Sequence, residues 1–214
     1  MCGLFGFIGT RLDIGLVNAL AGLAETRGPH AYGFAWLEGD RRMRGFKSPG
    51  RITERRADLL KLLDATAFIG HCRLSTSGAP ADNRNNQPLL MSDGESALAL
   101  AHNGNVYASR QIYDLHGYVP KTANDSEALL LAAFCAFGTL PERAAQGWAA
   151  IGKAKAQAAL LLSIEGIAAF RAYHHLYVKS TTTGIYLCSR PLDNTMALLP
   201  EGFVHHFQNS DQDS

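Results

Sequence analysis

The chain has 214 residues, of which 47% are apolar and 18% charged, and its formal net charge at pH 7 is +1. A nearly neutral chain has no general attraction for nucleic acids or anionic membrane surfaces, and no apolar run approaches the roughly 20 residues that span a bilayer. The N-terminus has no basic segment followed by an apolar stretch, which a signal peptide would need. We therefore expect a globular cytoplasmic protein with no nucleic-acid or membrane partner.

In the first half of the chain, apolar runs and turn residues predict several strands and helices. The glycine-spaced apolar run at 3–9 predicts a buried strand, and Asp13 is a suitable N-cap for a helix over 14–26. Further strands are expected at 32–38, 41–47, 67–72 and 96–102, and a charged helix capped by Thr53 is expected near 53–63. Residues 75–95 are rich in Asn, Gly, Pro and Ser, and predict a long polar loop of the kind that is usually functional.

In the second half, two helices precede a series of short strands. A helix is expected over 125–137, with Thr122 and Asn124 as cap candidates, and Thr139 to Glu142 match a capping box for the next helix. Strands are expected at 157–164, 167–173, 184–189 and 203–207, followed by a frayed polar tail at 208–214. Because helices and strands occur in separate runs without a linker or repeat, we expect one α+β domain over residues 1–214.

The four cysteines, Cys2, Cys72, Cys135 and Cys188, are widely separated and form no C-x-x-C pair. This pattern does not suggest a disulfide framework, so we expect free thiols in a reducing compartment. Removal of Met1 would leave Cys2 with both a thiol and a free α-amine, which titrates near pKa ~8. One residue would then supply a nucleophile and its base. The structural alternative is that Cys2 merely begins a buried strand.

Polar residues at the ends of apolar segments supply the other groups that a nucleophilic site needs. Arg73 could bind a carboxylate through two parallel hydrogen bonds, and Asp125 could bind an ammonium group. The side-chain amide of Asn103 and the backbone N–H of Gly104 could donate to the oxyanion of an acyl intermediate. Each residue alone also has a structural explanation, as a surface charge, a helix cap or a turn. Together they predict a site for a substrate with an amino-acid head group.

Five segments carry a family resemblance. In this order, MCGLFGFIG, RGPHAYG, GHCRLSTSG, AHNGNVY and NDSEALL strongly resemble the class II glutamine amidotransferases, whose nucleophile is an N-terminal cysteine. The resemblance covers nearly the whole chain. It implies an Ntn-hydrolase fold, a four-layer αββα sandwich in which two antiparallel sheets lie between helix layers. It also implies that Cys2 attacks the side-chain amide of L-glutamine, with no cofactor.

The resemblance implies further roles for individual residues. Arg27 would position the N-terminal residue, while Arg73 and Asp125 would hold the α-carboxylate and α-ammonium of glutamine. Thr76 and Ser77 would add substrate contacts, although some family members have histidine or valine where Ser77 stands.

No metal site is expected. The adjacent histidines His174-His175 and His205-His206 would point to opposite faces of a strand, so neither pair can readily chelate one ion. Loop contacts around His30 are expected to differ from those in the family, which often has an acidic residue there.

Three functions remain open from the sequence. The first is hydrolysis of glutamine, with ammonia passed to a separate synthetase or transferase subunit, because most family members are fused to a domain that uses the ammonia. The second is hydrolysis of another amide, such as a γ-glutamyl or acyl-amino-acid substrate. We rank it below the first because Arg73 and Asp125 together favour an amino-acid head group. The third is a non-catalytic regulatory or binding subunit. The presence of Cys2, Asn103 and Asp125 argues against it. For the first function we expect low basal activity, raised when a partner orders loop 75–95.

Overall fold

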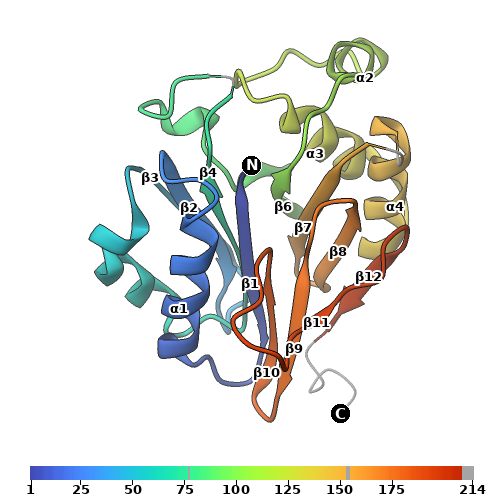
Figure 1. Cartoon of the computed structure of the whole chain (residues 1–214). Helices are drawn as coiled ribbons and strands as arrows, with labels where there is room; N and C mark the ends of the chain where they lie inside the picture. The colour runs from blue at the N-terminus through green and yellow to red at the C-terminus, as the bar shows by residue number, and fades with distance from the viewer. Residues whose placement is uncertain (77, 153–154, 209–214) are drawn as a thin grey trace.

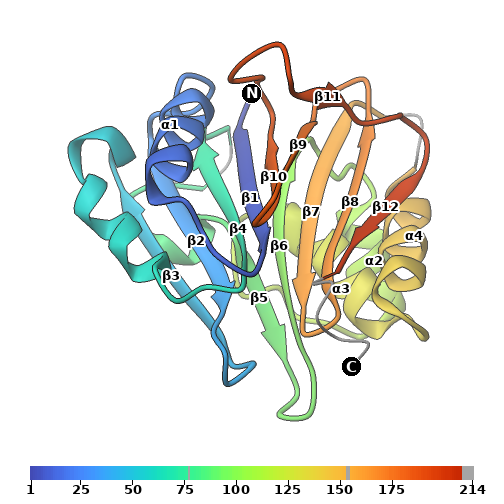
Figure 2. The same ribbon diagram turned by 90° about the horizontal axis from the view of Figure 1, so that it is seen from below.

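Two antiparallel sheets face each other at the centre of the molecule, and helices cover their outer faces (Figures 1 and 2). The computed structural model describes residues 1–76, 78–152 and 155–208. This architecture confirms the predicted four-layer αββα sandwich of two antiparallel sheets.

The larger sheet has seven strands in the order β11-β9-β10-β1-β4-β2-β3. Its strands are β1 (Gly3–Gly9), β2 (Ala31–Leu37), β3 (Met43–Pro49), β4 (Ala67–Arg73), β9 (Tyr177–Thr181), β10 (Gly184–Cys188) and β11 (Ala197–Leu198). β1 pairs with both β4 and β10. Segments from the two ends of the chain therefore lie side by side in one sheet.

The smaller sheet has five strands in the order β12-β8-β7-β6-β5. They are β5 (Leu89–Ser92), β6 (Ala97–Asn103), β7 (Gln157–Ser163), β8 (Gly166–Ala172) and β12 (Val204–Phe207). The helices α3 (Ser126–Cys135) and α4 (Leu140–Ile151) cover its outer face, α2 (Ser109–Leu115) packs against α3, and α1 (Ile14–Glu25) covers the larger sheet (Figure 2). Within the part of the chain that the structure describes, no helix is long and apolar enough to cross a membrane.

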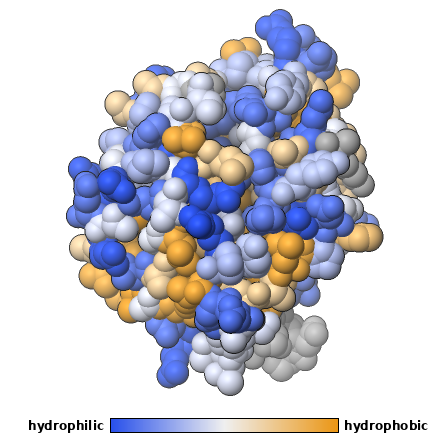
Figure 3. Space-filling view, viewed as in Figure 1, coloured by the Kyte–Doolittle hydropathy of each residue, from blue (hydrophilic) through white to orange (hydrophobic). Residues whose placement is uncertain are grey.

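The central strands are buried on both faces, which explains their apolar sequences. In β1, Phe5 and Phe7 belong to the core beneath α1, whereas Leu4 and Ile8 belong to the core between the sheets. Successive side chains of a strand point to opposite faces, and here each face meets a covered layer. Such a strand is a continuous apolar run rather than an alternating one, as the sequence at 3–9 is. On the outside, apolar residues form separate patches among hydrophilic ones on the face in Figure 3.

Two predicted helix starts are confirmed. The Asp13 side chain accepts a hydrogen bond from the backbone N–H of Leu16 at 3.0 Å and caps α1. At α4, Thr139 and Glu142 form the expected capping box. Both predictions depend only on residues within one turn of each other, so the tertiary structure has little influence on them.

The helix predicted near 53–63 is wrong in its type and in its cap. Two 3₁₀ helices occupy the region, at Ile52–Glu54 and Arg56–Leu62, and the Thr53 side chain caps neither. The Thr53 hydroxyl instead donates to the Glu25 carboxylate at 2.8 Å. Glu25 is only 4% exposed, and a buried carboxylate must find donors. This contact between distant segments replaces the local cap.

The predicted loop at 75–95 is also wrong in part, because it contains a 3₁₀ helix at Asn83–Asn85 and strand β5, which pairs with β6. Helix α2 and strands β9 and β11 were not predicted. β11 has only two residues, which is too short for a periodic pattern. Of the predicted tail at 208–214, all but Gln208 lies outside the described residues.

Candidate active site

The start of β1 and the ends of β4 and β6 meet at one end of the sandwich, where the N-terminus lies (Figure 1). Because β1 and β4 are antiparallel, Gly3 pairs with Cys72, and Cys2 therefore lies beside the end of β4. Its Sγ is 3.6 Å from the carbonyl oxygen of Leu74. From the other sheet, the Oδ1 of Asn103 accepts a hydrogen bond from the Cys2 backbone N–H at 3.1 Å.

The remaining donor of Asn103 is unused. The side chain is 3% exposed, and its Nδ2 is a buried atom with no hydrogen-bond partner in the described part of the chain. Leaving a buried donor unsatisfied costs about 1–3 kcal/mol. An acceptor supplied by a ligand beside Cys2 would remove that cost, which is what an oxyanion-binding amide does.

The Cys2 thiol is in a conflicting electrostatic environment. Burial raises its pKa above the usual value, and the positive charges of Arg73 and Arg27 oppose that rise without cancelling it. Both guanidinium groups are therefore near enough to stabilise a thiolate at Cys2. A full α-ammonium on Cys2 itself would add to this effect, because Coulomb energy increases as charges approach.

Arg27 contacts the residue that it is predicted to position. Its Nε donates to the Cys2 carbonyl oxygen at 2.9 Å, and its Nη2 lies 3.4 Å from the Met1 sulfur. The next residue, Gly28, packs directly on β4, and a Cβ there would overlap the backbone of Arg73 and Leu74. The glycine lets the end of α1 approach closely enough for Arg27 to reach Cys2.

Arg73 is 3% exposed and connects β4 to the following loop. Its Nη1 donates to the Asn86 side-chain oxygen at 2.8 Å, and its Nη2 donates to the Gly78 carbonyl at 3.1 Å. The guanidinium is thus fixed beside Cys2 by uncharged acceptors of the β4–β5 loop. Its predicted contact with a substrate carboxylate stays a prediction.

The other predicted substrate residues lie in two loops. Asp125 is half-buried just before α3, and its Oδ2 accepts a hydrogen bond from the Val106 backbone N–H at 2.7 Å. Thr76 is exposed in the β4–β5 loop, and Ser77 lies outside the described residues. The structure thus brings Cys2, Arg27, Arg73, Asn103 and Gly104 together, and ties Asp125 to the segment that follows Gly104.

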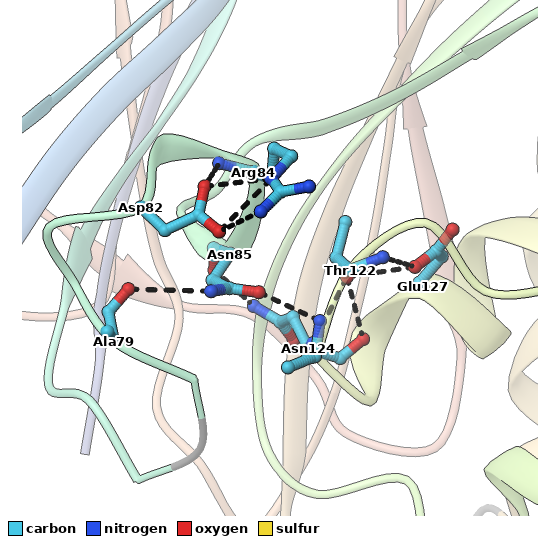
Figure 4. Close-up of polar contacts among 8 residues, drawn as sticks. Ala79, Asp82, Arg84, Asn85, Thr122, Asn124 and Glu127 are labelled. Atoms are coloured by element: carbon cyan, nitrogen blue, oxygen red, sulfur yellow. Dashed lines mark hydrogen bonds and ion pairs between the residues drawn. The ribbon is translucent and has the colours of Figure 1, made fainter.

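Asparagine side chains join these two loops (Figure 4). The Asn85 Oδ1 accepts from the Ala123 backbone N–H at 2.8 Å, and the Asn124 Nδ2 donates to the Asn85 carbonyl at 2.9 Å. The β4–β5 loop is therefore fixed against the segment that leads into Asp125. This role of Asn85 was not predicted from the sequence, although the polar run Asn83–Gln87 was a signal.

A buried polar cluster beneath the Asn103-Gly104 turn was not predicted either. It consists of Gln87, His102, Ser126 and Gln157, each no more than 4% exposed. Burial lowers the pKa of His102, so its ring is neutral near pH 7. The signal in the sequence was Gln157, a single polar residue at the start of the apolar run at 157–164. Of the described residues, no group of three or more His, Cys, Asp or Glu is arranged to hold a metal.

Comparison with known proteins matches residues 1–165 to the family model described as "Glutamine amidotransferases class-II". Glutamine–fructose-6-phosphate aminotransferase of Chlorobaculum tepidum is 37% identical over 139 residues, which cover 61% of this chain and 22% of that protein. Amidophosphoribosyltransferase of Drosophila melanogaster is 34% identical over 161 residues, or 70% of this chain and 29% of that protein. The match thus spans well under a third of these two relatives.

Solved structures show the same fold. The glutamine phosphoribosylpyrophosphate amidotransferase of B. subtilis superposes with a TM-score of 0.77 at 21% identity, covering 97% of this chain and 49% of that one. A glutamine aminotransferase class-II domain protein of Silicibacter pomeroyi superposes with a TM-score of 0.58 at 15% identity, covering 97% and 99% of the two chains.

Proposed function

Since the chain belongs to the class-II glutamine amidotransferases, we propose that it hydrolyses the side-chain amide of L-glutamine to glutamate and ammonia, with Cys2 as the nucleophile. The observation that carries this proposal is the contact between Asn103 and Cys2. The Asn103 side chain accepts a hydrogen bond from the Cys2 nitrogen, and its buried Nδ2 has no hydrogen-bond partner among the described residues. An N-terminal nucleophile needs its nitrogen held in place, and an oxyanion site needs a free donor.

The reaction begins after removal of Met1. The α-amine of Cys2 takes the thiol proton, and the thiolate sulfur attacks the amide carbon of the glutamine side chain. The Asn103 Nδ2 and the Gly104 N–H donate to the oxyanion. The protonated amine then gives its proton to the leaving nitrogen, which departs as ammonia. The amine next activates a water molecule, and hydrolysis of the thioester releases glutamate and restores the thiol.

The substrate head group is held by charge. Arg73 binds the α-carboxylate, Asp125 binds the α-ammonium, and Thr76 and Ser77 add contacts from the β4–β5 loop. The burial of Arg73 beside Cys2 supports its part in this arrangement. Arg27 holds the Cys2 carbonyl, so the nitrogen and sulfur of Cys2 keep a constant position relative to Asn103.

The ammonia goes to an acceptor on a synthetase or transferase, either a separate subunit or another domain. The relatives' names include fructose 6-phosphate in one case and a phosphoribosyl group in the other. Because the reaction needs a free thiol at Cys2, a reducing compartment such as the cytoplasm suits it.

A direct assay tests the proposal. The purified chain, with loss of Met1 verified by intact mass, is incubated with glutamine, with a γ-glutamyl amide and with an acyl-amino acid, and the released products are measured. We expect glutamate and ammonia from glutamine, and no release by Cys2→Ala. If another amide is hydrolysed faster than glutamine, that amide and not glutamine is the substrate. Release that persists in Cys2→Ala would refute the nucleophile.

A further inference from the structure

The buried cluster beneath the Asn103-Gly104 turn forms one continuous chain of hydrogen bonds. The His102 backbone N–H donates to the Gln87 Oε1 at 2.6 Å, and the Gln87 Nε2 donates to the Ser126 Oγ at 3.2 Å. The His102 ring lies 2.9 Å from that Oγ through Nδ1, and its Nε2 contacts the Gln157 Oε1. The Gln157 Nε2 donates to the Asn105 carbonyl at 3.1 Å.

These contacts allow only one arrangement of protons. The Gln157 Oε1 can only accept, so the His102 Nε2 carries the hydrogen and its Nδ1 accepts from the Ser126 hydroxyl. Each polar side-chain atom of Gln87, His102, Ser126 and Gln157 then has at least one hydrogen-bond partner. A fully satisfied buried network is rigid, whereas a partly satisfied one is costly.

Gln157 occupies the decisive place in this network. Its amide contacts His102 through one end and Asn105 through the other, so it spans the two residues Asn103 and Gly104 that lie between them. Gly104 packs against it so closely that a Cβ at this position would overlap the Gln157 Oε1. The space under Gly104 is therefore filled by the Gln157 amide together with the His102 ring.

A purely packing role does not explain a glutamine here. The neighbouring residues of β7 that face the cores are alanine and leucine, and an apolar side chain would fill the space without the cost of burying an amide. The hydrogen bonds of Gln157 go to the residues on either side of the two proposed oxyanion donors. Small displacements of such donors weaken transition-state stabilisation.

Resting on the proposed function, we propose that Gln157 is a positioning residue that holds the Asn103-Gly104 turn, through His102 and Asn105, so that both donors meet the oxyanion. It touches neither substrate nor nucleophile. Its contribution therefore belongs to the transition state and not to ground-state binding of glutamine.

The first test compares Gln157→Met with Gln146→Met, a matched control on the exposed side of α4. For Gln157→Met we expect kcat to fall roughly 10- to 100-fold, less than or equal to the loss of a whole oxyanion donor, with KM for glutamine within about twofold. Alkylation of Cys2 by iodoacetamide forms a sulfur–carbon bond as iodide leaves and involves no oxyanion. Its rate should be unchanged in both variants.

The second test uses Gln157→Glu, which also serves if Gln157→Met does not fold. A neutral carboxylic acid can accept from His102 and donate to Asn105, whereas the carboxylate cannot donate and places negative charge beneath the oxyanion. The ratio of variant to wild-type kcat should therefore rise as the pH is lowered. A ratio that is constant with pH would overturn the proposal.

Amide hydrogen exchange separates this proposal from the proposed function. If the wild-type chain does not hydrolyse glutamine, the proposed function is refuted. Faster amide exchange at residues 103–105 in the Gln157 variants than in Gln146→Met would still support the positioning role. Unchanged exchange at 103–105 would overturn it. An unchanged kcat in Gln157→Met, or equal losses of kcat and of Cys2 alkylation, would overturn it too, because equal losses indicate a general collapse of the site.

Discussion

Asn103 and Cys2 are 101 residues apart in the chain, and they are joined by a hydrogen bond of 3.1 Å between the Asn103 Oδ1 and the Cys2 nitrogen. Asn103 ends β6 of one sheet, and Cys2 precedes β1 of the other. The contact therefore spans the sandwich at the end where the predicted site residues gather. It also fixes the orientation of the Asn103 amide, whose Nδ2 must then point elsewhere.

Replacing Asn103 should affect turnover more than binding. In Asn103→Ala we expect kcat for glutamine to fall roughly 10²–10³-fold, because the lost donor acts mainly on the oxyanion of the transition state. KM should change only a few-fold. Steady-state kinetics measure both. A rise in KM as large as the fall in kcat would mean that Asn103 binds ground-state substrate instead.

Retention of Met1 should abolish glutamine hydrolysis. An amide nitrogen at Cys2 has no basic lone pair, so the thiol would lose its base. Met1 is 61% exposed, which leaves it accessible to an aminopeptidase. A preparation with an N-terminal tag should be inactive until a protease exposes Cys2, and a C-terminal tag serves as the control. Full activity in protein that keeps Met1, as judged by intact mass, would refute the amine as the base.

The four thiols should react with iodoacetamide in an order set by exposure and pKa. Cys135 is exposed and should react first, whereas Cys72 and Cys188 are buried, burial raises the pKa of each, and both should react only on unfolding. Burial also raises the pKa of Cys2, so with Met1 retained its rate should keep increasing above pH 9. Peptide mass spectrometry measures the extent of alkylation at each cysteine. Removal of Met1 should increase the rate of Cys2 alkylation at pH 8. A slower alkylation would contradict the expected effect of the α-ammonium group of Cys2.

Arg73→Lys should raise KM for glutamine at least tenfold while changing kcat much less. Lysine keeps the positive charge but lacks the planar fork that binds a carboxylate through two hydrogen bonds, and it cannot donate to both Asn86 and Gly78 as the guanidinium does. Steady-state kinetics over a range of glutamine concentrations that reaches saturation separate the two effects. An unchanged KM would show that the α-carboxylate binds elsewhere.

Glu25→Gln should destabilise the fold in a pH-dependent way. Burial opposes ionisation of Glu25, but hydrogen bonds from Thr53 and Arg51 outweigh it and lower the pKa below the ordinary value. A carboxylate whose pKa is lower in the folded state stabilises that state fully above its unfolded pKa of about 4.3. The stabilisation is lost as the pH falls through the lower, folded value.

We therefore expect Glu25→Gln to reduce the free energy of unfolding by roughly 1.5–3 kcal/mol at pH 7, the range for hydrogen bonds to charged groups. The difference from wild type should shrink in acid, below about pH 4. Urea unfolding at several pH values measures it, with the exposed Glu54→Gln as control. A difference that grows on acidification would show that the carboxylate is not stabilised in the fold.

Much of this protein could be predicted from its sequence alone. The apolar run at 3–9, the Asp13 cap and the capping box at Thr139 depend on neighbours within one turn or one strand, and all appear in the structure as expected. The family resemblance of five short motifs predicted Cys2 and Asn103 as site residues. These features could be predicted because they depend on residue type and on the order of residues within short segments.

Only the tertiary structure decided which side chains these residues meet. Thr53 was expected to cap a helix and instead binds Glu25, and Gln157 was expected only to begin a strand and instead lies under Gly104. Both outcomes follow from burial, because a buried polar group takes whatever partner the packing of distant segments brings to it. The pairing of β1 with β4 and the stacking of the two sheets select those partners, and they depend on hydrophobic contacts summed over the whole chain.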